Sequence, residues 1–176
     1  MKISAVKFFL TSLWLIFGFL ATNFNNTSRV LAEAPPEFSH VINGQKITVN
    51  KSEFGVRIVD SQGKANFFPT TKIPLKKGDA YGWRIQLQNY RGKVKWREVL
   101  SLPKTPETWA TQEKDENFSL SADGRTATTT RTQTSTNGVI ENFWQIAPGD
   151  PLGKHKIEVY IDDHIIAIFE FETVEF

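Results

Sequence analysis

The stretch 80-AYGWRIQLQ-88 decides the fold, because its large side chains fall on every second position. These large residues are Tyr81, Trp83, Ile85 and Leu87. In an extended chain they would all point to one side, and the small or polar residues between them would point to the other. An alternation of this kind is typical of a β-strand with one face in a core and one face in water.

The same period of two continues along the chain, and no segment shows the 3.6-residue stripe of an amphipathic helix. Further strands are expected at 45–49, 53–60, 93–102, 117–121, 125–135, 139–146, 154–161 and 165–174. The extended segment 65–73 contains Pro69 and precedes Pro74, neither of which can donate to a ladder, so it should lie at a sheet edge. Asp123-Gly124 and Asn137-Gly138 are hairpin-turn signals. Strands this short and frequent predict an all-β fold, an immunoglobulin-like antiparallel β-sandwich.

The N-terminus is expected to be an export signal. Basic residues precede the apolar block 8-FFLTSLWLIFGFLA-21, which falls short of the roughly 20 residues that span a bilayer. Ala32 and Ala34 fit the small-residue pattern of signal peptidase, so we expect residues 1–34 to be removed. Cleavage nearer Ala21, or retention as an uncleaved membrane anchor, are the alternatives. Residues 35–52 would then be a lead-in segment, and 53–176 the sandwich domain.

Export predicts the periplasm, the thylakoid lumen if the source is a photosynthetic bacterium, or the extracellular space. The chain has no cysteine, which excludes disulfides, thiolate metal sites and a lipid-modified cysteine. Loss of residues 1–34 would take the formal net charge from +2 to zero, because that segment holds three basic residues and one acidic residue. Nothing in this balance favours nucleic acid as a partner, and membrane contact is expected only through an uncleaved signal sequence.

Asp162, Asp163 and His164 form the most conspicuous cluster of possible metal ligands. They lie between two apolar-patterned runs, where Asp-Asp can occupy the left-handed positions of a hairpin turn. Successive side chains at a strand end splay apart, so three neighbours rarely converge on one ion. We interpret the cluster as a turn, and the alternative is a weak calcium site shared with Asp150.

Catalytic motifs are missing from the sequence. It contains no Gly-x-Ser-x-Gly elbow, no His-Glu-x-x-His, no phosphate-binding glycine loop and no dinucleotide fingerprint. Glu98 is the one acid that falls on an apolar strand face, where desolvation would raise its pKa. Either a bulge replaces it with Val99, or it finds a partner such as Arg84 or Arg97. We predict no enzyme, no catalytic residue and no cofactor.

Aromatic and basic residues suggest two kinds of contact surface. Trp83, Trp96 and Trp144 are in phase with core aliphatic residues, which leaves Trp109 and Tyr90 as loop aromatics that could stack on a sugar. Residues 81–102 are expected to form a hairpin, and its solvent face would display Arg84, Arg91, Lys93, Lys95 and Arg97. They would form a solvated face or an edge protected by charge, or a patch for lipid head groups or acidic polysaccharide.

The run 68-FPTTKIPLKKGDAYGW-83 and the ending, with 146-IAPG-149 and 169-FEFETV-174, resemble a bacterial family of exported immunoglobulin-like domains without an assigned function. The similarity covers about residues 54–174, although Asp163 stands where such hairpins often carry glycine. The resemblance implies a sandwich fold and brings no catalytic residues. We therefore expect a non-catalytic exported module that binds or scaffolds another envelope component, either a protein or a glycan. The alternatives are a carbohydrate-binding module and a weak calcium-binding domain.

Overall fold

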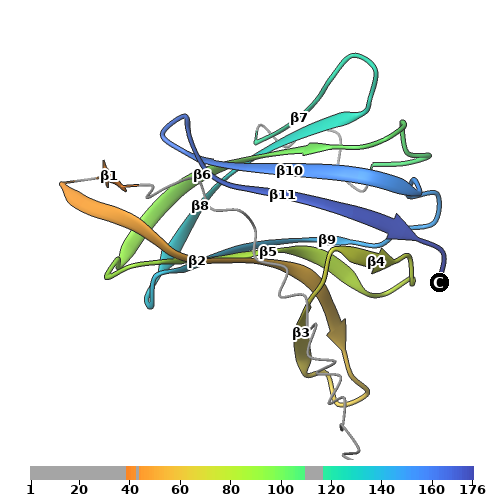
Figure 1. Ribbon diagram of the computed structural model, residues 1–176, viewed down its shortest axis with the longest axis horizontal. Helices are drawn as coiled ribbons and strands as arrows, with labels where there is room; N and C mark the ends of the chain where they lie inside the picture. Colours follow the sequence, from red (N-terminus) through yellow and green to blue (C-terminus); the bar gives the residue numbers. More distant parts are fainter. Residues whose placement is uncertain (1–38, 43, 110–116) are drawn as a thin grey trace, which may run out of the picture.

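The computed structural model describes residues 39–42, 44–109 and 117–176, and the expected signal segment lies outside them. All regular elements in these ranges are strands (Figure 1). They are β1 (Ser39–Ile42), β2 (Gln45–Val59), β3 (Ala65–Pro69), β4 (Lys72–Pro74), β5 (Ala80–Leu87), β6 (Gly92–Ser101), β7 (Phe118–Leu120), β8 (Thr126–Ser135), β9 (Val139–Gln145), β10 (Gly153–Ile161) and β11 (His164–Val174). Within the described ranges no helix is long and apolar enough to span a membrane.

The strands form two stacked sheets. The smaller sheet has the order β1-β2-β5-β9, with β3 also paired to β2, and the larger has the order β4-β11-β10-β6-β8-β7. In immunoglobulin terms, β2, β5 and β9 occupy the places of strands A, B and E, while β6, β10 and β11 occupy those of C, F and G. The strand β8 extends the larger sheet beside β6, as strand C′ does in variable-type domains. The predicted immunoglobulin-like sandwich is confirmed.

The core lies between the sheets and contains the residues that the alternation placed inward. Trp83, Ile85 and Leu87 of β5 are fully buried, and they belong to one core cluster with Ile157 and Val159 of β10 in the other sheet. Trp83 and Trp96 meet edge to face, with ring centroids 5.1 Å apart. The prediction that these tryptophans belong to the core rather than to a surface site is therefore correct.

The strand β2 is longer than the sequence indicated. It runs from Gln45 to Val59 through the expected boundary between lead-in and domain at residue 52, with one extra residue, Asn50, between the pairs Val49–Leu87 and Lys51–Gln86. A bulge of this kind lets one strand continue while its side chains change phase.

The position of Gly82 in β5 admits only glycine, because an added Cβ would lie 2.0 Å from the carbonyl oxygen of Asn142.

Two expected hairpins are instead crossings between the sheets. β5 lies in the smaller sheet and β6 in the larger, so residues 88–91 carry the chain from one layer to the other. The Asn137-Gly138 turn likewise connects β8 of the larger sheet to β9 of the smaller one. Asp123-Gly124, in contrast, does join the paired strands β7 and β8. A turn signal predicts that the chain reverses, but a hairpin and a crossing both reverse it.

The outermost strands carry features that block further pairing. β3 ends at Pro69 and β4 contains Pro74, which confirms the expected edge position of the proline-bearing segment. At the opposite edge of the smaller sheet, the backbone N–H of Glu141 in β9 donates to the side-chain oxygen of Gln133 at 3.3 Å. The short β7 forms the other edge of the larger sheet. These features satisfy or remove backbone donors that would otherwise attract another strand.

Candidate functional site

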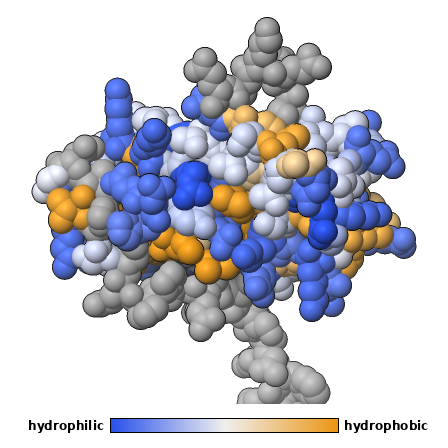
Figure 2. All heavy atoms as spheres, turned by 90° about the horizontal axis from the view of Figure 1, so that it is seen from above, coloured by the Kyte–Doolittle hydropathy of each residue, from blue (hydrophilic) through white to orange (hydrophobic). Residues whose placement is uncertain are grey.

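The outer face of the larger sheet carries the charged side chains of its central strands (Figure 2). The register places Glu172 of β11 beside Lys154 of β10 on one side and Lys72 of β4 on the other. One step along, Glu170 of β11 faces Lys156 of β10. Acidic and basic side chains therefore alternate across three neighbouring strands.

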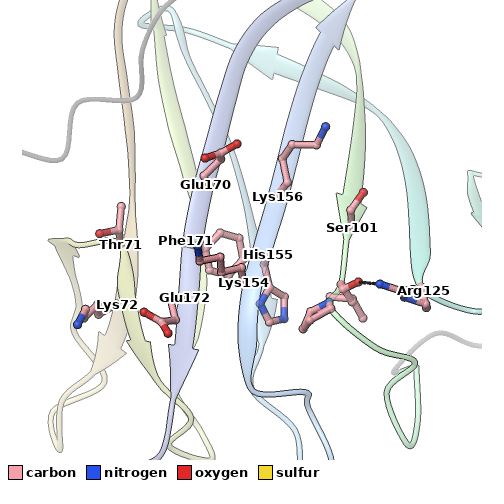
Figure 3. Close-up of a pocket in the computed structure, with 12 residues that line it drawn as sticks. Thr71, Lys72, Ser101, Arg125, Lys154, His155, Lys156, Glu170, Phe171 and Glu172 are labelled. Carbon is pink, nitrogen blue, oxygen red and sulfur yellow. Dashed lines mark hydrogen bonds between the residues drawn. The ribbon is translucent and has the colours of Figure 1, made fainter.

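A groove of 490 Å³ lies over these alternating acidic and basic side chains (Figure 3). Its rim includes Lys72, Lys154, Lys156, Glu170 and Glu172. Lys156 contacts the carboxylate of Glu158 at 3.2 Å. Lys72, Lys154, Glu170 and Glu172 form no ion pair within the described part of the chain. The groove thus presents charged side chains of both signs to a ligand.

The wall of the groove adds apolar surface. His155 and Phe171 line it and stack with ring centroids 5.0 Å apart, and Leu102 and Pro103 follow the end of β6. Burial lowers the pKa of His155, whose Nδ1 lies 2.8 Å from the carbonyl oxygen of Gly153. Arg125 donates to the carbonyl oxygen of Leu102 at 3.4 Å and closes the far side (Figure 3). The groove has no local signature in the sequence, because the residues that line it come from strands that are distant in the chain.

The predicted basic patch is divided between opposite faces of the molecule. Arg84 lies on the outer face of the smaller sheet, where its Nε contacts Glu141 at 2.9 Å and its guanidinium lies over the ring of Phe67. Lys95 and Arg97 lie on the outer face of the larger sheet. The prediction of one surface for these residues was wrong, because it assumed that β5 and β6 form a hairpin.

The loop aromatics proposed for sugar stacking are held by the domain itself. Tyr90 is only 3% exposed, and its hydroxyl donates to the carbonyl oxygen of Lys93 at 2.8 Å. Trp109 is half-buried and packs edge to face against Trp144, and its indole N–H donates to the carbonyl oxygen of Gly124 at 3.0 Å. Tyr90 therefore offers no open ring face to a sugar, and Trp109 offers only part of one.

The Asp-Asp-His stretch is a two-residue hairpin turn between β10 and β11. Asp162 and Asp163 both have positive φ, at 47° and 62°, as a type I′ turn requires. Asp163 contacts Arg97 at 3.3 Å. Asp150 precedes β10 and the turn follows it, so a strand of 9 residues separates them, about 30 Å at the usual rise. The suggested calcium site shared by Asp150 and the turn therefore has ligands at opposite ends of the sandwich.

Glu98 is fully buried and has found partners, although not the arginines that the sequence suggested. No bulge displaces it, and three donors from the opposite sheet reach its carboxylate. The indole N–H of Trp144 donates to Oε1 at 2.6 Å, the amide of Asn142 donates to Oε2 at 3.0 Å, and Trp83 also donates to Oε2. Burial raises the pKa of Glu98, and the three hydrogen bonds oppose that rise. The acid is fully buried and joins the two sheets through these hydrogen bonds.

The fold defines the protein as a β-sandwich domain of immunoglobulin-like topology. The chain belongs to the PM0630 beta sandwich domain family, which matches residues 52–174, and this confirms the predicted family resemblance. It is also similar to a solved immunoglobulin-like protein from Pseudomonas aeruginosa, with 19% identity and a TM-score of 0.49, covering 74% of this chain and 98% of the other. No curated protein matches the chain.

Proposed function

We propose that the protein is a non-catalytic exported module that binds another protein of the cell envelope through the groove of Figure 3. The observation that carries the proposal is the set of unpaired charges of both signs at Lys72, Lys154, Glu170 and Glu172. A neutral sugar would add no counter-charge of its own to these side chains. A polypeptide that carries both acidic and basic side chains complements them and fixes its own register by doing so.

The composition of the groove and the blocked sheet edges support a protein partner as well. Pro103 is partly exposed beside the charged rim, and Leu102 and Phe171 are buried beneath it. A bound segment would cover Pro103 and exclude water from the rim, which would strengthen any ion pair formed with the partner. The blocked edges of β3, β4 and β9 favour a face rather than an added strand as the mode of contact.

The test is site-specific photo-crosslinking in the native envelope. A photoreactive residue at Ser101, within the groove, should give one discrete adduct, and the same residue at Ser61, in the exposed β2–β3 turn, should give none. Reversal of charge at Lys154→Glu together with Glu172→Lys should abolish the adduct, while Lys64→Glu should leave it intact. An adduct that survives the double reversal would contradict the proposal, and so would labelling of equal strength at Ser61.

A further inference from the structure

A second surface on the larger sheet lies where β6 and β8 run side by side. The register pairs Lys93 with Thr134, Lys95 with Thr132, and Arg97 with Thr130. The intervening residues of β6, including Val94 and Trp96, are buried in the core. The paired lysines and threonines therefore all point outward, away from the core.

The spacing of this surface is regular in both directions. Outward side chains recur about every 7 Å along a strand, and directly paired residues have Cβ atoms about 5 Å apart. Each cation of β6 thus has a hydroxyl of β8 beside it and another cation one step along. Threonines continue the row on β8 at Thr126 and Thr128.

Two of the three cations of this surface, Lys93 and Lys95, are open to a ligand. Lys93 and Lys95 are exposed and form no ion pair in the ranges that the structure describes. Arg97 lies over the ring of Tyr160 at 3.9 Å and contacts Asp163, which holds its guanidinium in place. Next to it, a hollow of 240 Å³ is bounded by Lys95, Arg97, Thr130, Tyr160 and the Asp162-Asp163 turn.

We propose that this face, defined by Lys93, Lys95, Arg97, Thr130, Thr132 and Thr134, binds a linear acidic polysaccharide. Such a polymer carries carboxylates and hydroxyls at regular intervals along one chain, and the face offers ammonium groups and hydroxyls at regular intervals along two strands. The cations would attract the carboxylates, while the threonines would exchange hydrogen bonds with sugar hydroxyls. Rigid strands hold these groups in place, so little conformational entropy is lost on binding.

An anionic membrane is the other partner with matching charge, and the composition of the face argues against it. Polybasic lipid-binding segments usually contain about 4–8 clustered basic residues, whereas this face has three, one of which already contacts Asp163. Membrane-binding surfaces also insert aromatic or aliphatic side chains, but Trp96 is buried and Tyr160 lies beneath Arg97. A flat array of short hydroxyl groups suits a polymer lying along the strands better than a bilayer.

The experiment is affinity electrophoresis of the purified chain in gels that contain polygalacturonate, with neutral dextran as the reference polymer. Polygalacturonate should retard the protein at low salt and lose its effect at high salt, and dextran should not retard it. Lys93→Gln together with Lys95→Gln should weaken binding about fivefold, as expected for two exposed charge contacts. Lys46→Gln together with Lys64→Gln makes the same change in net charge elsewhere and should have little effect.

A second pair of variants separates specific recognition from simple charge attraction. Thr132→Val and Thr134→Val keep the size and β-preference of the side chains but remove their hydroxyls. Combined, they should also weaken binding while leaving the thermal unfolding midpoint almost unchanged. Equal weakening by both lysine pairs, or binding to vesicles containing phosphatidylglycerol without binding to polygalacturonate, would overturn the proposal.

Discussion

Replacement of Trp144 by phenylalanine should make the stability of the protein depend on pH in a new way. The indole N–H of Trp144 is the donor to Oε1 of Glu98. Trp144→Phe removes this donor but keeps an aromatic ring in the cluster with Trp109 and Phe118. Among the residues that the structure describes, the donors that remain to Glu98 are Trp83 and Asn142, which both reach Oε2.

Trp144→Phe should lower the free energy of unfolding for two reasons. A hydrogen bond to a buried charged group contributes about 1.5–3 kcal/mol, and this part exists only while Glu98 is ionised. The smaller ring costs about 1–2 kcal/mol in lost contact, at every pH. Because the lost hydrogen bond lowers the pKa of Glu98 in the wild type, the variant should have a folded-state pKa higher still.

The direction of the pH effect follows from this difference. Burial raises the folded pKa of Glu98 above its ordinary value of 4.5, so the wild type loses stability as the pH rises from 4.5 to the folded pKa. In the variant this loss continues to a higher pH. The deficit of the variant should therefore shrink on acidification, by at most about 1.4 kcal/mol per pH unit between the two folded pKa values.

Urea unfolding between pH 4 and pH 10 measures this effect, and Trp109→Phe is the matched control. Trp109 lies in the same aromatic cluster, 6.0 Å from the ring of Trp144, but its indole N–H donates to a backbone carbonyl. Its deficit should stay constant with pH. A deficit for Trp144→Phe that is equally constant would refute the assigned role of the hydrogen bond to Glu98.

Three further predictions concern backbone geometry and the buried histidine. Asp163→Gly should stabilise the protein by about 0.5–1 kcal/mol in urea unfolding, because glycine adopts the observed φ of 62° without strain; a loss of stability would contradict the turn geometry. Gly82→Ala should cost about 3 kcal/mol or more, since its Cβ would meet the Asn142 carbonyl at 2.0 Å, whereas Gly63→Ala at an open turn should cost less in the same assay. Burial lowers the pKa of His155, so stability should fall as the pH drops from its ordinary pKa of 6.5 to the folded value. His155→Gln should remove that fall in melting curves recorded between pH 7.5 and pH 5, and an unchanged fall would exclude His155 as its source.

The strands could be predicted from the sequence because burying one face of a sheet forces a period of two on the large residues. This holds for Tyr81–Leu87, whose inward side chains are the predicted ones. The Asp-Asp turn could also be predicted, because the expected strands 154–161 and 165–174 left only Asp162, Asp163 and His164 between them. Local spacing was sufficient for each of these features.

Sheet membership and the groove could not be predicted, because both depend on contacts between distant residues. The residues at 88–91 reverse the chain, but nothing local states whether the next strand pairs in the same layer. The donors to Glu98 lie 15, 44 and 46 residues away in sequence. One signal was nevertheless available. Buried indole N–H groups need acceptors, and an acid on an apolar face needs donors, so Glu98 and the core tryptophans could have been matched.

The protected edge strands of the sandwich affect how the domain behaves at high protein concentration. Pro69, Pro74 and the Gln133 amide interrupt or occupy the edge strands β3, β4 and β9, so a second molecule has fewer places to extend either sheet. Concentrated solutions should therefore stay monodisperse instead of assembling into ribbons. Natural variants that alter these three positions should aggregate before they lose affinity for a partner. These positions therefore contribute to solubility rather than to recognition.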